Sequence, residues 1–140
     1  MSEDAKLAFT REYQQKIPYI AHLGMLTEAL GEGTARLSLQ VTPQLTNSFG
    51  TVHGGAILSL LDVTLCTAAR TLHPDSIGVM TIDMSACFIG GGSGSRLLAE
   101  GRVLKNGRSM IFAEGEAKNA DGSLVAKAIA TVRVRLKESK

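Results

Sequence analysis

Residues 54–72 read GGAILSLLDVTLCTAARTL and form the one long helical candidate in the chain. Their apolar side chains recur at spacings of three and four positions, which is the period of a helix with one face in a core. The residues on this face are Ile57, Leu61, Leu65, Ala68 and Leu72. Further leucines and alanines lie around the rest of the circumference, so we expect the helix to be largely buried at the centre of the domain.

Strand candidates precede and follow this helix. Two of them, Gly24 to Leu30 and Gly33 to Val41, meet at a glycine-rich turn and predict a hairpin. Four more follow the helix, separated by Gly-rich or Asn/Asp-Gly turns, at roughly 78–88, 96–105, 109–119 and 124–136. Long antiparallel strands on both sides of one buried helix predict an α+β domain in which the sheet wraps the helix.

The N-terminal segment predicts a short helix over Asp4 to Lys16, which ends at Pro18. Apolar side chains recur every four positions, so we expect their side of this surface helix to pack on the core. These residues are Ala5, Phe9, Tyr13 and Ile17. We take residues 1–22 as the N-terminal helix and lead-in of a single domain spanning 1–140. A chain of 140 residues can bury a core without a disulfide or a metal.

Composition excludes several classes of protein. Apolar residues make up 44% and charged residues 20%, as in soluble globular proteins. The sequence has no unbroken apolar run of roughly 18 to 20 residues and no signal-peptide pattern, so we expect a cytoplasmic protein without a membrane partner. The net charge of +2 is small and the basic residues are dispersed, so we expect no nucleic-acid partner.

The two cysteines, Cys66 and Cys87, lack the Cys/His spacing of a zinc site. Both lie in apolar sequence, where a free cysteine usually behaves as a small hydrophobic residue. We therefore expect no metal and no role in chemistry for either thiol.

The candidate chemistry lies where a loop meets the central helix, in the stretch from Asn47 to Ala56, NSFGTVHGGA. The first N–H groups of a helix have no internal partner and lie at the positive end of its dipole. Because Gly54 and Gly55 lack side chains, a substrate oxygen can approach these groups, as in an oxyanion hole. His53 could cap the helix or orient a substrate, and Asn47 alone would be an ordinary loop residue.

Asp62 lies two turns into the helix on a mostly apolar side, where a carboxylate needs either a structural partner or a catalytic role. It is eight residues from Gly54, which is about 12 Å along the axis, too far for both to reach one reacting carbon. We therefore expect an obligate dimer in which Gly54 of one subunit faces Asp62 of the other across a two-fold axis.

The arrangement of Asn47, His53-Gly54-Gly55 and, after six residues, Asp62 resembles the PaaI-type (phenylacetic-acid-pathway) branch of hotdog-fold acyl-CoA thioesterases. The likeness extends to Phe9 to Met25, Val79 to Phe88, the Asn106 to Ser109 turn and Asp121 to Ala126. It implies hydrolysis of acyl-CoA by a homodimer, commonly paired into a homotetramer, with no cofactor beyond the CoA of the substrate.

The resemblance also implies roles for single residues. Asp62 would act as nucleophile or general base, Gly54 of the neighbouring subunit would supply the oxyanion-hole N–H, and Asn47 and His53 would position water, carbonyl or carboxylate. Thr81 is the first candidate for a helping hydroxyl, and Ser85 the second.

Contacts with CoA are implied for Gly55, Lys105 and Arg108, the last two through the phosphates. The chain departs from the family where a proline-containing turn is usual, because it has Ile89 followed by the glycine-rich run 90–94. This difference leaves the shape of the pocket wall there open.

Three alternatives remain at this point. The acyl group could be aromatic or medium-chain, since pocket depth depends on residues such as Leu58, Leu65, Met80 and Phe88. The protein could be a non-catalytic acyl-CoA-binding sensor, or a hotdog hydratase or dehydratase. The sensors normally carry an added DNA-binding segment, and the hydratases pair a histidine with a carboxylate in a differently spaced motif.

Overall fold

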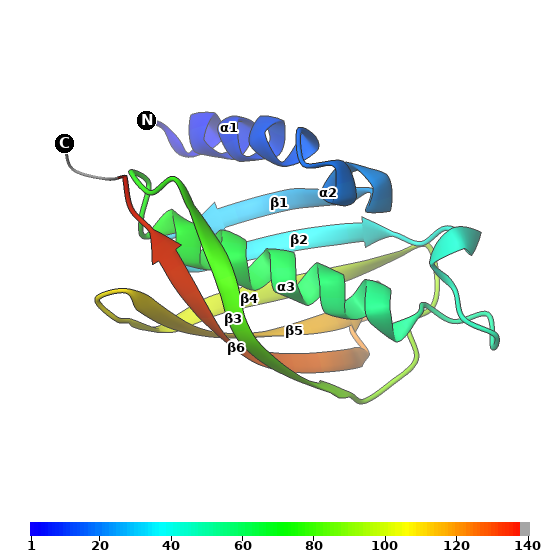
Figure 1. Ribbon diagram of the computed structural model, residues 1–140. Helices are drawn as coiled ribbons and strands as arrows, with labels where there is room; N and C mark the ends of the chain where they lie inside the picture. Colours follow the sequence, from blue (N-terminus) through cyan, green and yellow to red (C-terminus); the bar gives the residue numbers. More distant parts are fainter. Residues whose placement is uncertain (138–140) are drawn as a thin grey trace.

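A six-stranded antiparallel sheet wraps around one long helix, as Figure 1 shows. The computed structural model describes residues 1–137, so the last three residues of the predicted domain, 138–140, lie outside the described residues. The helices are α1 (Glu3–Gln15), α2 (Pro18–Leu23), the short 3-10 helix η1 (Pro43–Leu45) and α3 (Gly54–Thr71). The strands are β1 (Met25–Gly31), β2 (Thr34–Gln40), β3 (Gly78–Phe88), β4 (Arg96–Asn106), β5 (Met110–Asn119) and β6 (Leu124–Arg135).

The strand order β1-β2-β4-β5-β6-β3 places β3, the strand that follows α3, at one edge of the sheet. This is the predicted hotdog fold, and the strand boundaries agree with the expected ones to within one residue at nearly every end. The sequence periods account for this agreement, because β6 buries every second side chain from Ala126 to Val134 and exposes most of those between.

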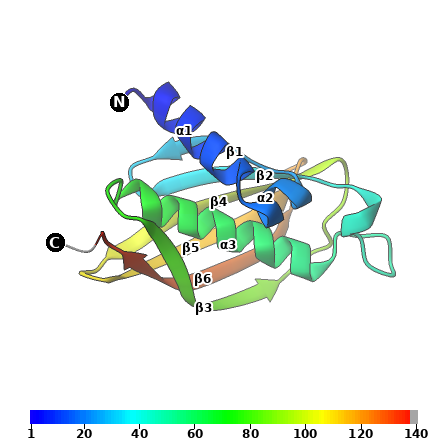
Figure 2. The same ribbon diagram turned by 45° about the horizontal axis from the view of Figure 1, so that its top comes forward.

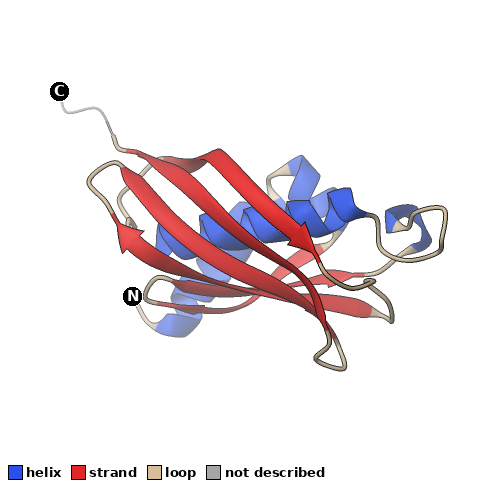
Figure 3. Cartoon of the chain, turned by 90° about the horizontal axis from the view of Figure 1, so that it is seen from below, coloured by secondary structure: helices blue, strands red, loops and turns tan. Residues whose placement is uncertain are grey.

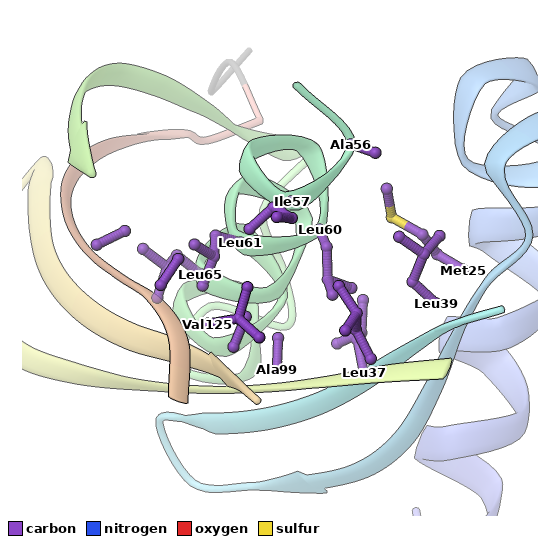
Figure 4. Close-up of a cluster of buried hydrophobic side chains, with 14 of the residues drawn as sticks. Met25, Leu37, Leu39, Ala56, Ile57, Leu60, Leu61, Leu65, Ala99 and Val125 are labelled. Atoms are coloured by element: carbon purple, nitrogen blue, oxygen red, sulfur yellow. The ribbon is translucent and has the colours of Figure 1, made fainter. Parts of the chain in front are cut away.

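Helix α3 packs in the concave face of the sheet. Figure 4 shows Leu60, Leu61 and Leu65 among the buried side chains between helix and strands. Two strand glycines allow α3 to lie close to the sheet. A Cβ atom at Gly101 would lie 2.9 Å from the Leu65 side chain, and one at Gly115 would lie 3.0 Å from it. No helix within residues 1–137, α3 included, is long and apolar enough to cross a membrane.

One stripe of α3 stays uncovered by the rest of the chain. Gly55 and Leu58 on this stripe are exposed, and Asp62 and Cys66 are half-buried. We call these four residues the open stripe of α3. The helix is therefore largely buried, as expected, except along this stripe, which coincides with the candidate chemistry.

The predicted packing face of α1 is only partly correct: the Tyr13 ring contacts Arg70 of α3 and Ile17 packs on the core, but Phe9 does not. Phe9 is 55% exposed, and the buried residue of α1 is Gln14. The Gln14 Nε2 atom donates a hydrogen bond to Thr67 Oγ1 on α3 (3.0 Å), and its Oε1 accepts one from Thr27 Oγ1 on β1 (2.5 Å). A polar bridge thus orients this helix, and apolar periodicity cannot reveal such a bridge.

Pro18 ends α1 as expected, but it also begins the short helix α2, which the sequence analysis did not anticipate. Proline suits the first position of a helix because the N–H it lacks would have no partner there. Gly24 ends α2 in the left-handed conformation, with φ of 76°, and turns the chain into β1. Figure 2 shows α1 and α2 together on the β1 side of α3.

Candidate active site

His53 forms the N-cap of α3. Its backbone is extended, and its Nδ1 atom accepts a hydrogen bond from the Gly55 N–H at 2.8 Å. With Nδ1 as acceptor, a neutral imidazole carries its proton on Nε2, and this atom remains available to a ligand. A Cβ atom at position 55 would lie 3.0 Å from Nδ1, so glycine at this position lets the cap close.

The two glycines therefore differ in what their N–H groups can do. The Gly55 N–H is engaged by His53, whereas the Gly54 N–H has no hydrogen-bond partner among residues 1–137. Gly54 is half-buried beside the ring of Phe88, where an added Cβ atom would make an ordinary contact at 3.5 Å. Of the predicted pair, Gly54 is the residue that presents a free donor at the positive end of α3.

Asn47 closes the loop before the helix. Its Oδ1 atom accepts hydrogen bonds from the backbone N–H groups of Phe49 (2.9 Å) and Thr51 (3.2 Å), and its Nδ2 donates to Thr51 Oγ1 (3.0 Å). The structure does not bring Asn47 to Asp62 within the described chain. It places Asn47 in the turn that leads to His53, whose N–H donates to the Leu45 carbonyl at 2.7 Å.

Asp62 meets Thr81 across the space between α3 and β3. Thr81 Oγ1 donates a hydrogen bond to Asp62 Oδ1 at 2.5 Å. The other carboxylate oxygen, Oδ2, accepts no hydrogen bond from the part of the chain that the structure describes. One oxygen of a half-buried carboxylate is therefore held in place, and the other is free for a ligand.

A β-bulge at Ile82 explains why Thr81 reaches Asp62. Side chains alternate along a regular strand, so Thr81 and Met84 should lie on opposite faces. The pairing of β3 with β6 shifts between Thr81 and Asp83, and as a result both Thr81 and Met84 face α3. Met84 and Ala86 pack on the core, so Ser85 between them lies on the other face of the sheet, and of the two candidate hydroxyls it is Thr81 that contacts Asp62.

Cys66 is part of this cluster, a fact that the sequence analysis missed. Its Sγ atom lies 3.2 Å from Thr81 Oγ1 and 4.0 Å from Asp62 Oδ1. Burial raises the pKa of the Cys66 thiol to about 11. The spacing of four residues from Asp62, one helical turn, was the available signal. Cys87 is exposed, and so the expectation of a small buried hydrophobic residue does not hold for it.

The predicted CoA contacts Lys105 and Arg108 lie far from Gly54 along the molecule. They are exposed at the β4–β5 turn. This turn lies near the C-terminal end of α3, because His73, just after the helix, makes a 2.7 Å hydrogen bond to Asn106. Gly54 begins the same 18-residue helix, roughly 27 Å away along its axis.

A prominent groove of the described chain lies elsewhere. It measures about 870 Å³ and is a groove on the outer face of the sheet, lined by charged side chains such as Arg36, Glu100 and Glu116. Figure 3 shows this face in front of α3. Neither Gly54 nor Asp62 lines this groove, so the open stripe of α3 is the better candidate for chemistry.

Comparison with known proteins identifies several relatives of this chain. A Saccharolobus solfataricus protein that carries an esterase name is 35% identical over 100 residues, 71% of each chain. The medium/long-chain acyl-CoA thioesterase YigI of Escherichia coli is 26% identical over 133 residues, 84% of this chain and 86% of YigI. The solved structure of E. coli PaaI, from the phenylacetic acid degradation operon, superposes with a TM-score of 0.78 at 21% identity, covering 95% of this chain and 98% of that one.

The Thioesterase superfamily model matches residues 49–126, which are more than half of the chain and include His53, Gly54, Asp62 and Thr81. This match confirms the predicted class of enzyme, a thioester hydrolase, and the PaaI-like hotdog fold. The chain belongs to the thioesterase superfamily.

Proposed function

We propose that the protein is an acyl-CoA thioesterase that hydrolyses aromatic or medium-chain acyl-CoA to the free acid and CoA. The observation that carries this proposal is the carboxylate of Asp62, of which one oxygen is hydrogen-bonded and the other is not. Thr81 holds Oδ1 at 2.5 Å, and Oδ2 of this half-buried side chain has no hydrogen-bond partner in the described chain. A carboxylate in this state can attack a thioester carbonyl or deprotonate a water molecule that does so.

The negative charge that develops on the attacked carbonyl oxygen needs a donor. The Gly54 N–H is free and lies at the positive end of α3, so we assign it this role. His53 supports it by engaging the Gly55 N–H and holding the first turn of the helix in place. Asn47 supports the same turn through the loop that it closes.

Gly54 and Asp62 of one chain cannot act together, because eight residues of one helix separate them by about 12 Å. A second copy resolves this difficulty. Strand β3 is an edge strand with a free hydrogen-bonding side, and its Met80 and Ile82 side chains are each 50% exposed. Antiparallel pairing of two β3 strands would cover this edge and set two α3 helices side by side in opposite directions.

In such a homodimer each site takes Asp62 and Thr81 from one subunit and the Gly54 N–H from the other. Because the two helices run in opposite directions, the C-terminal end of one α3 lies beside the N-terminal end of the other. The β4–β5 turn of one subunit therefore approaches the Gly54 end of its partner. This brings Lys105 and Arg108 toward the CoA phosphates of a substrate bound there. A homotetramer of two such dimers stays a prediction from the family resemblance, and a cytoplasmic location stays a prediction from the sequence.

A panel of acyl-CoA substrates tests this function. We expect free thiol to appear with phenylacetyl-CoA or medium-chain acyl-CoA, and Asp62→Asn to abolish the release. Asp75→Asn is the matched control, because Asp75 is exposed, lies outside β3 and has no ion pair within residues 1–137. Equal rates for wild type and Asp62→Asn would contradict the proposed mechanism.

A further inference from the structure

Cys66 is the one polar group of the open stripe of α3 that the proposed mechanism leaves without a role. It lies one helical turn after Asp62, and its Sγ atom is within hydrogen-bond distance of Thr81 Oγ1, at 3.2 Å. Thr81 in turn donates to Asp62 Oδ1. The three side chains thus form a chain of contacts that ends at the carboxylate.

The direction of these bonds follows from the number of protons available. The carboxylate of Asp62 can only accept hydrogen bonds, so the Thr81 hydroxyl donates its single proton to a hydrogen bond with Oδ1. The Thr81 oxygen is then left with lone pairs for its other neighbour. Burial raises the pKa of Cys66 to about 11, so the thiol carries its proton at neutral pH. Of the two acceptors within reach, Thr81 Oγ1 at 3.2 Å is nearer than Asp62 Oδ1 at 4.0 Å, so the thiol donates to Thr81.

We propose that Cys66 is a positioning residue for thioester hydrolysis: its S–H donates to Thr81 Oγ1, which commits the Thr81 hydroxyl to Asp62 Oδ1 and leaves Oδ2 free for the reaction. This inference rests on the proposed thioesterase function. The thiol forms no covalent bond to the substrate and transfers no proton during the cycle. Its effect is to exclude the other rotamers of the Thr81 hydroxyl, in which Asp62 would lose its partner.

Kinetics of five variants measure this effect. Cys66→Ala removes the donor, and we expect kcat to fall about fivefold, the worth of one ordinary hydrogen bond, with KM nearly unchanged. Cys66→Ser keeps a donor and should restore most of kcat. In a Thr81→Val background, Cys66→Ala should cause no further loss, because the valine side chain has no oxygen to orient. Cys87→Ala, the other thiol, is the matched control and should leave kcat at the wild-type value.

The S–H stretching band in the infrared tests the hydrogen bond without any substrate. In a Cys87→Ala background Cys66 holds the only thiol, and we expect its band at the low frequency of a donating S–H and a shift upward on Thr81→Val. The inference is overturned if Thr81→Val leaves the frequency of the S–H band unchanged. It is also overturned if Cys66→Ala lowers kcat by the same factor in the Thr81→Val background as in the wild type. A different result would contradict the proposed function alone. In that case the wild-type protein would release no free CoA from any acyl-CoA, while the S–H band would still shift as expected and confirm the hydrogen bond.

Discussion

Thr81 Oγ1 on β3 lies 2.5 Å from Asp62 Oδ1 on α3, and a bulge one residue further along the strand makes this contact possible. The bulge changes which face each later residue of β3 occupies, so that Thr81 and the core residue Met84 share the side of the sheet that faces α3. A local irregularity of an edge strand therefore orients the carboxylate that we place at the centre of the chemistry.

The first prediction concerns this contact. Thr81→Val removes the hydroxyl but keeps the shape of the side chain, and we expect kcat for acyl-CoA hydrolysis to fall about tenfold, since the lost hydrogen bond is to a charged group. Thr81→Ser keeps the hydroxyl and should retain most of the activity. A Thr81→Val enzyme with wild-type kcat would show that Asp62 needs no partner on β3.

The second prediction separates the N–H of Gly54 from its lack of a side chain. Gly54→Pro deletes the N–H at the first position of α3, where proline is well tolerated, and we expect kcat to fall about a hundredfold or more. Gly54→Ala keeps the N–H, and its methyl group has room beside the Phe88 ring, so this variant should lose much less. Circular dichroism should show α3 intact in both. Equal activities would mean that the N–H has no catalytic role.

The third prediction concerns the polar bridge under α1. Gln14→Leu leaves the fully buried hydroxyl of Thr27 without its acceptor, and we expect the free energy of unfolding to fall by about 1–3 kcal/mol. Urea denaturation measures this change. Gln15→Leu, on the neighbouring exposed residue, is the control and should be nearly neutral. A Gln14→Leu protein as stable as the control would show that α1 is held by apolar packing alone.

The fourth prediction follows from the raised pKa of Cys66. The thiol has a pKa of about 11 in the folded protein against an ordinary value of 9.0, so the folded state favours the protonated form. Its contribution to stability is complete below pH 9 and is lost as the pH rises from 9 toward 11. We expect the free energy of unfolding of wild type to decline over this range more than that of Cys66→Ser. Parallel pH profiles would contradict the raised pKa.

The sequence predicted the fold well because periodic apolar residues determine it. The helical spacing of Ile57, Leu61 and Leu65 and the alternation along β6 both appear in the structure as expected. The face of α1 could be predicted only in part in this way, because Gln14 is held by hydrogen bonds to residues distant in the sequence. Period alone favoured Phe9 instead, which the structure leaves exposed.

The candidate site shows the same division. The motif of His53, Gly54 and Asp62 was recognisable from residue types and spacing. The preference for Thr81 over Ser85 depends on the bulge at Ile82, and a bulge leaves no clear trace in residue order. The free N–H of Gly54, and the engaged one of Gly55, likewise appear only once the His53 ring is placed.

Mixing two inactive variants tests the shared site most directly. Asp62→Asn and Gly54→Pro subunits are denatured together, refolded and assayed with the best acyl-CoA substrate. If each site combines Asp62 of one subunit with Gly54 of its partner, half of the dimers are mixed and hold one intact site each, so activity should recover to about a quarter of wild type. Activity that stays at the level of the separate variants would place both residues of each site in one chain and contradict the shared-site account.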